Sequence, residues 1–377
     1  MPNGVKGASA GRGFKAVNEA THIKPLTAVR FFAALWVVLF HYWPKLAGAG
    51  ESTFVSRGYL GVELFFVLSG FILCHVYLPA MEGERFKYGS FLWARIARVY
   101  PLHIVTLVGV GALALGATVA GFGIDPAILS WSSLPANLLM VQAWGLAPEA
   151  GWNHPSWSIS AEWFAYLTFP LFGWAALSLK TRPYAAFAGA CALLAGLYVV
   201  FPLFSGFALT KATIAWGALR IVPCFALGCA AYLVWRSGAI TARNVALGLS
   251  AVFTAAILIL AVADAPDAVL VMLFGGLMVA LAALTSTGSK VGSGRVGVYL
   301  GEISYAMYMV CIPWKLLFVN AAAKLLGIEE HLPLWLWLVF IASVVPLAAL
   351  AHHLVERPAR AALKTLAERR IRKPKFA

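Results

Sequence analysis

Charged residues are scarce in this sequence: only 12% of its 377 residues are Asp, Glu, Lys or Arg, whereas 61% are hydrophobic. Soluble domains average roughly 25% charged and 45–50% apolar residues, so a soluble fold could not bury this much apolar surface. The same composition excludes an intrinsically disordered or collagen-like chain. The chain is therefore expected to be a polytopic membrane protein.

Several sequence signals are missing altogether. The five cysteines lie inside apolar runs and form no CxxC pair, so we expect neither a disulfide framework nor a metal site. Residues 1–25 are basic but have no apolar core, which excludes a cleavable signal peptide. No internal repeat is evident, which argues against a transporter built from paired halves.

Long apolar runs are what the sequence does contain. Each run approaches the roughly 20 residues that a spanning helix needs, which predicts an all-α bundle of about ten transmembrane helices. The runs cover residues 28–46, 58–79, 91–120, 156–179, 184–204, 214–236, 243–263, 267–286, 297–319 and 333–356. The stretch 127–146 contains Pro135, Asn137 and Gln142, and is predicted to be a re-entrant or surface segment.

The distribution of Lys and Arg predicts the orientation. If the N-terminus is inside, the inner segments hold 23 of the 29 basic residues and the outer loops hold only four. This bias places both termini in the cytoplasm. The net charge of +14 is therefore expected to interact with anionic lipids of the inner leaflet rather than with nucleic acid. We expect a basic N-terminal segment (1–25), a transmembrane domain (26–360) and a basic cytoplasmic tail (361–377) that lies as a helix on the inner surface.

Two ionisable residues inside the spans are candidates for chemistry. His41 lies eleven residues beyond Arg30, about 16 Å along the helix axis and a little past mid-bilayer. Glu162 follows the presumed interfacial Trp157 by about 7 Å, which places it near the depth of His41 and suggests a general-base pair. The alternatives are a histidine that only bonds a neighbouring helix and a glutamate that only caps a helix start.

Two further groups of polar residues are expected at the site. Arg95 and Arg98 share one helix face at the predicted cytoplasmic boundary and, with Arg30, could hold phosphates; the alternative is an ordinary collar of positive charge. Substrate contacts are expected from polar and aromatic residues within or at the ends of the spans: Glu63, Ser69, Trp157, Tyr166 and Tyr305. The small residues Gly61 and Gly70 are expected to allow close helix packing.

Six short motifs follow one another in a fixed order. They are Arg30 and, ten residues further, His41; GVELFFVLSG (61–70); Arg95-x-x-Arg98; Trp157-Ser-x-x-x-Glu162; ISYAMY (303–308); and Glu356-x-Pro358. Over residues 26–360 the chain thereby resembles the acyltransferase 3 family, the bacterial membrane enzymes that O-acetylate exopolysaccharides, O-antigens and related glycans. The resemblance implies ten core helices, a bacterial inner-membrane location and an acyl-coenzyme A donor from the cytoplasm.

The resemblance also implies roles for individual residues. His41 would be the essential catalytic histidine, Arg30 would act with it, and Arg95 and Arg98 would contact coenzyme A. One departure is Cys311, which stands where many relatives have a second histidine. The chain shows no appended hydrolase-like domain, so the membrane part is expected to perform the whole transfer.

The sequence thus predicts a membrane O-acyltransferase. Acetyl-CoA or another acyl-CoA would donate the acyl group to a hydroxyl of a cell-surface glycan or its lipid-linked precursor, with no metal. His41 would act as a general base or carry the acyl group covalently, two mechanisms that the sequence leaves open. The alternative is a proton-coupled transporter, for which intramembrane ionisable groups are equally suitable. The sequence leaves room for a homo-oligomer.

Overall fold

The computed structural model describes residues 22–119, 121, 126–328 and 331–372. Most of the predicted N-terminal segment and the last five residues of the predicted tail lie outside this range. In the described part the secondary structure is helical, and the only β-type pairings are two isolated bridges, Leu46–Leu332 and Thr213–Trp216. The all-α prediction is therefore confirmed.

Nine helices of the described part are long and apolar enough to cross a membrane. Their α-helical cores are α2 (Lys24–Tyr42), α4 (Gly61–Glu82), α5 (Tyr88–Val119), α9 (Pro183–Ser205), α10 (Gly217–Arg236), α11 (Arg243–Val262), α12 (Asp267–Ser286), α13 (Arg295–Leu326) and α14 (Leu334–Ala351). A five-residue π-helical turn, η8 (His352–Glu356), joins α14 to α15 (Arg357–Arg372).

The remaining predicted span, 156–179, is divided into two shorter helices, α7 (Trp157–Leu167) and α8 (Phe169–Ser178). Pro170 lies in the first turn of α8 and has no N–H to donate to the carbonyl of Tyr166. At this break the amide and the hydroxyl of Thr168 both donate to the Phe164 carbonyl (3.0 and 2.8 Å). The proline therefore explains why about ten apolar runs give nine long helices.

The stretch 127–146 forms no long helix, as predicted. It consists of short turns, η3 (Pro126–Leu129), η4 (Trp131–Ser133), α6 (Leu134–Leu138) and η5 (Gln142–Trp144). Gln142 is buried and donates to the Ser156 carbonyl (3.1 Å), and the Ala143 amide donates to the Ser160 hydroxyl (3.0 Å). The segment therefore folds against the start of α7 and covers it.

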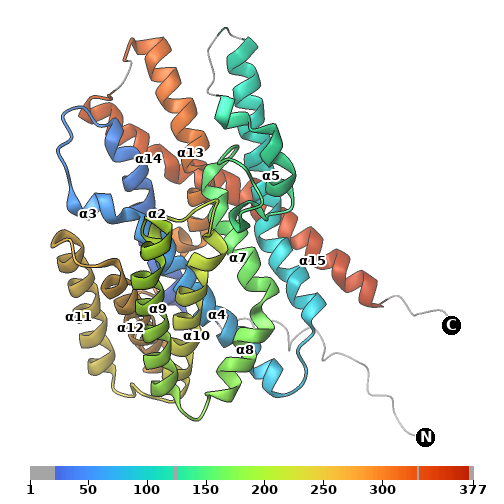
Figure 1. The fold of residues 1–377 in the computed structure, drawn as a ribbon, viewed down its shortest axis with the longest axis vertical. Coiled ribbons are helices and arrows are strands. Elements are labelled where there is room, and N and C mark those ends of the chain that lie inside the picture. Colours follow the sequence, from blue (N-terminus) through green and yellow to red (C-terminus); the bar gives the residue numbers. More distant parts are fainter. Residues whose placement is uncertain (1–21, 120, 122–125, 329–330, 373–377) are drawn as a thin grey trace, which may run out of the picture.

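The centre of the bundle is the contact between α4 and α10, with α2 packed on α13 beside it (Figure 1). A Cβ atom at Gly70 would lie 2.2 Å from the Phe225 carbonyl oxygen, and one at Gly228 would lie 1.9 Å from the Val67 oxygen. Only glycine permits this approach, so the predicted packing role of Gly70 is confirmed. Helices α11 and α12 lie side by side at one edge, and α15 runs beside α5 at the other (Figure 1).

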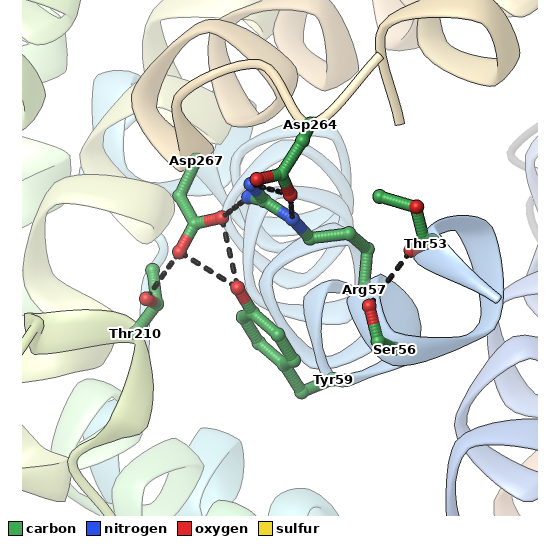
Figure 2. Close-up of polar contacts among 7 residues, drawn as sticks. All are labelled: Thr53, Ser56, Arg57, Tyr59, Thr210, Asp264 and Asp267. Atoms are coloured by element: carbon green, nitrogen blue, oxygen red, sulfur yellow. Dashed lines mark hydrogen bonds and ion pairs between the residues drawn. The ribbon is translucent and has the colours of Figure 1, made fainter. Parts of the chain in front are cut away.

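The two ends of the bundle differ in charge. At the end that we call the basic end, α10 finishes at Arg236, and α11 and α13 begin at Arg243 and Arg295. At the opposite end, Figure 2 shows the Arg57 guanidinium between two carboxylates, with Nη2 of Arg57 2.6 Å from Asp264 and Nη1 paired with Asp267. The Tyr59 hydroxyl also donates to Asp267 (2.9 Å), so this cluster joins the start of α4 to α12.

Candidate active site

A cavity of about 690 Å³ lies between α2, α4, α5, α7, α13 and α15. It extends from the basic residues of α15 to Ser158 and Tyr308 in the interior. There the Ser158 hydroxyl donates to the Tyr308 oxygen (2.8 Å), and Tyr308 donates to the Pro155 carbonyl (2.9 Å). The cavity therefore joins the basic end of the bundle to a polar floor.

The three arginines predicted to bind phosphate all line this cavity. Arg30 comes from α2, and Arg95 and Arg98 come from one face of α5. Arg95 lies over the Tyr77 ring at 5.5 Å and its buried Nε has no hydrogen-bond partner among the described groups. Among the residues that the structure describes, none of the three forms a salt bridge to a carboxylate, so their charge is available to an anion.

Helix α15 adds three cations that the sequence reasoning did not assign to the site: Arg357, Arg360 and Lys364. Their spacing of three and then four residues places them on one helix face. This pattern is visible in the sequence, but it is equally compatible with a helix that lies on the inner membrane surface. Among the described residues, six basic side chains line the cavity against three carboxylates, Glu162, Glu302 and Glu356. The cavity therefore carries an excess of three positive charges.

Glu162 and Ser69 meet in the interior of the cavity. The Ser69 hydroxyl of α4 donates to the Glu162 carboxylate of α7 at 2.7 Å. Tyr166, one turn further along α7, lines the cavity beside Glu162, and the Tyr305 hydroxyl donates to the Val99 carbonyl (2.7 Å). Ser69, Tyr166 and Tyr305, three of the five predicted substrate contacts, thus line the cavity.

His41 lies at the other end of α2, outside the lining of the cavity. The Lys315 ammonium donates to the His41 backbone carbonyl (2.9 Å), and the charged groups that act on the imidazole are Lys315 and His154. Burial lowers the pKa of His154 below its usual value, which favours the neutral ring at neutral pH. His154 adjoins Pro155, so the turn η6 (His154–Ser156) is close both to His41 and to the floor of the cavity.

The predicted contact between Glu162 and His41 is wrong. The Glu162 carboxylate attracts the guanidinium groups of Arg30 and Arg98. The charges that influence the His41 imidazole are those of Lys315 and His154, and neither is a carboxylate. The error came from treating Trp157 as an interfacial residue at the outer edge. Trp157 is only 5% exposed because the preceding segment covers it, so α7 begins deep in the protein and Glu162 lies at the level of Arg30.

Glu63 and Trp157, the other two predicted substrate contacts, do not line the cavity. Glu63 is fully buried and forms an ion pair with Arg220 of α10, whose guanidinium lies 4.6 Å from the Trp157 ring. The Trp157 ring also packs edge to face against the ring of Phe66, with the two ring centroids 6.2 Å apart. Phe66 does line the cavity. These contacts join α4, α7 and α10 behind the cavity wall.

Within the described ranges, no group of three or more His, Cys, Asp or Glu side chains is arranged to hold a metal ion. Cys311, at the position of the missing second histidine, is buried, and its carbonyl accepts from the Tyr42 hydroxyl (2.7 Å). Cys311 thus contacts Tyr42, the residue that follows His41, but supplies no second imidazole.

Comparison with known proteins identifies the class of enzyme. The chain is 29% identical to the acyltransferase MdmB of Streptomyces mycarofaciens over 380 residues, which cover 90% of this chain and 92% of that protein. It is 30% identical to protein 2 in the picA locus of Rhizobium radiobacter over 148 residues, 36% of this chain and 75% of the relative. A candidate O-acetyltransferase of Staphylococcus aureus is 29% identical over 105 residues, 28% of this chain but only 16% of that protein. No solved structure matches the chain.

The family model of an acyltransferase domain matches residues 24–353, nearly the whole helical bundle. The protein is therefore a multi-pass membrane O-acyltransferase, and the transporter alternative is set aside. The chain belongs to the acyltransferase 3 family.

Proposed function

We propose that this enzyme transfers an acetyl group from acetyl-CoA to a hydroxyl of a cell-surface glycan, such as an exopolysaccharide, or of its lipid-linked precursor. Its location would be the bacterial inner membrane, with both termini in the cytoplasm. The observation that carries the donor assignment is the cavity with six basic side chains against three carboxylates. Coenzyme A carries a diphosphate and a 3′-phosphate, and arginine forks bind phosphate by charge-assisted hydrogen bonds.

The donor would enter from the basic end of the bundle. Arg30, Arg95 and Arg98 would bind its diphosphate, and the pantetheine arm would run past the Ser69–Glu162 pair toward Ser158 and Tyr308. The thioester would then arrive at the floor of the cavity, near η6 and His41. This direction is supported by the charge, because the six cations among the described residues of the cavity lining include three from α15, whereas His41 lies outside the lining.

His41 would act as the catalytic base. As the acceptor hydroxyl attacks the thioester carbonyl, the imidazole takes the hydroxyl proton; the carbon–sulfur bond breaks, and the coenzyme A thiolate takes a proton from the imidazolium. A covalent acyl-imidazole on His41 is the variant of this mechanism. Ser69, Tyr166 and Tyr305 would line the donor path, and Glu162 would hold Ser69 and balance part of the arginine charge.

Two assays test this proposal. Purified protein in detergent should release free coenzyme A from acetyl-CoA or transfer labelled acetyl groups to a glycan acceptor, and His41→Ala should abolish this activity. Mass spectrometry of surface glycans from cells with and without the protein should then show the loss of one O-acetyl group per repeating unit. A protein that binds no coenzyme A and releases none would contradict the donor assignment.

A further inference from the structure

The three cations of α15 line the cavity and are exposed, whereas Ser158 and Tyr308 at its floor are buried. Arg357, Arg360 and Lys364 occupy one face of the helix, and that face lines the cavity. At the same end, α5 begins at Tyr88 and presents Arg95. The side chains of α15 are therefore the part of the cavity lining that an entering ligand would meet first.

Two contacts hold α15 in this orientation. The indole Nε1 of Trp93 on α5 donates to the Leu363 carbonyl at 2.9 Å. This bond ties α15 to α5, beside which it runs in Figure 1. At the start of the helix, the π-helical turn η8 pairs His352 with Glu356 at 2.9 Å, and both residues line the cavity. Because these contacts fix the rotation of α15, its basic face is directed at the cavity rather than along the membrane surface.

Among the described residues that line the cavity, basic side chains outnumber carboxylates. Arg98 and Arg95 lie close enough to Arg360 to repel its guanidinium, and Glu356 attracts it less strongly. Glu356 is itself paired with His352. Like charges brought this close favour a bound polyanion, because the ligand removes their mutual repulsion and adds charge-assisted hydrogen bonds.

We propose that α15 forms the outer half of the donor site and that Arg357, Arg360 and Lys364 bind the 3′-phosphate of coenzyme A. This inference rests on the proposed donor. A donor whose thioester lies near His41 must leave its adenosine 3′-phosphate at the opposite end of the cavity. The diphosphate would then lie between the two groups of cations, with Arg30, Arg95 and Arg98 on its inner side. The same phosphate chemistry is present in anionic lipid headgroups, so the test separates the two sources.

The test compares two triple variants in neutral detergent. R357Q/R360Q/K364Q removes the cations of α15, and R243Q/K290Q/R295Q removes three exposed cations from the same end of the bundle but outside the cavity. Each is titrated with coenzyme A and with dephospho-coenzyme A, which lacks only the 3′-phosphate. We expect the α15 variant to lose about ten-fold or more in affinity for coenzyme A and much less for dephospho-coenzyme A, while the control variant resembles wild type. If the triple variant folds poorly, Lys364→Gln alone replaces it in the test, because this side chain is exposed. It should show the same pattern more weakly.

Three results would overturn the inference. Equal losses for both ligands would mean that α15 does not bind the 3′-phosphate. Unchanged coenzyme A affinity in neutral detergent, with an effect of the α15 variant only in bilayers of anionic lipid, would make α15 a lipid-binding helix. Failure of folded wild-type protein to bind either ligand would refute the proposed donor itself, and is distinguished from the first two results by the wild-type titration.

Discussion

The buried ion pair between Glu63 and Arg220 should make each of the two side chains dependent on the other. The Glu63 side chain is 0% exposed and that of Arg220 is 2% exposed. Nη1 of Arg220 also donates to the Ala212 carbonyl (2.8 Å), whereas Nη2 of Arg220 and Oε2 of Glu63 have no partner among the described groups. Neither charge can reach solvent if the other is removed.

Replacing one partner should therefore be costly. Glu63→Leu or Arg220→Met leaves an uncompensated buried charge, which typically costs about 3–5 kcal/mol, or roughly a hundred-fold to a few thousand-fold in the ratio of folded to unfolded protein. The double variant removes both charges and replaces them with side chains of similar size. It should lie within about 2 kcal/mol of wild type, the remaining cost being the unpaired Ala212 carbonyl.

The assay is reversible unfolding in mixed micelles with increasing SDS, followed by tryptophan fluorescence, for wild type, both single variants and the double variant. Lys180→Gln is the control, because it breaks a salt bridge to Glu82 (2.8 Å) in which the Lys180 side chain is 46% exposed, and such pairs contribute about 1 kcal/mol or less. If the double variant were destabilised by the sum of the two single effects, the two side chains would be energetically independent and the argument from burial would fail.

Three further predictions concern the chemistry. His41→Ala should insert and fold normally yet transfer no acyl groups, since no second histidine stands at position 311; near wild-type turnover would remove His41 from the mechanism. Arg95→Gln and Arg98→Gln should each weaken coenzyme A binding by about ten-fold, as measured by titration calorimetry, because charge-assisted contacts are lost. Unchanged affinity would mean that these arginines belong only to the positive charge at the membrane boundary. Glu162→Gln should leave the ascending limb of the single-turnover pH–rate profile in place, because its carboxylate faces Arg30 and Arg98 rather than His41; a limb that moves to lower pH would restore the contact with the histidine.

The sequence by itself determined the class of fold and identified three of the six cations among the described residues that line the cavity. Apolar runs near 20 residues in length can only be spanning helices in a chain this poor in charge, so run length and composition sufficed to predict the nine long helices of the described part. The tenth predicted span is the one divided into α7 and α8. The arginines were found for a related reason. A charged residue within a membrane span is energetically costly, so its presence in an apolar run indicates a specific role. The spacing of Arg95 and Arg98 places them on one helix face whatever the tertiary structure.

Tertiary structure alone decided which groups share a site. The depth of Glu162 depended on whether Trp157 lies at the membrane edge, and that depended on a segment without helical periodicity that folds over the start of α7. Glu63 was visible as an intramembrane carboxylate, but its partner Arg220 is 157 residues away and is brought to it only by the packing of α4 on α10. The basic face of α15 could be read from the sequence, yet its direction was set by η8 and by the bond from Trp93 to the Leu363 carbonyl. Local pattern fixes which face of a helix is polar, whereas the rotation and depth of that helix are set by contacts between residues far apart in the chain.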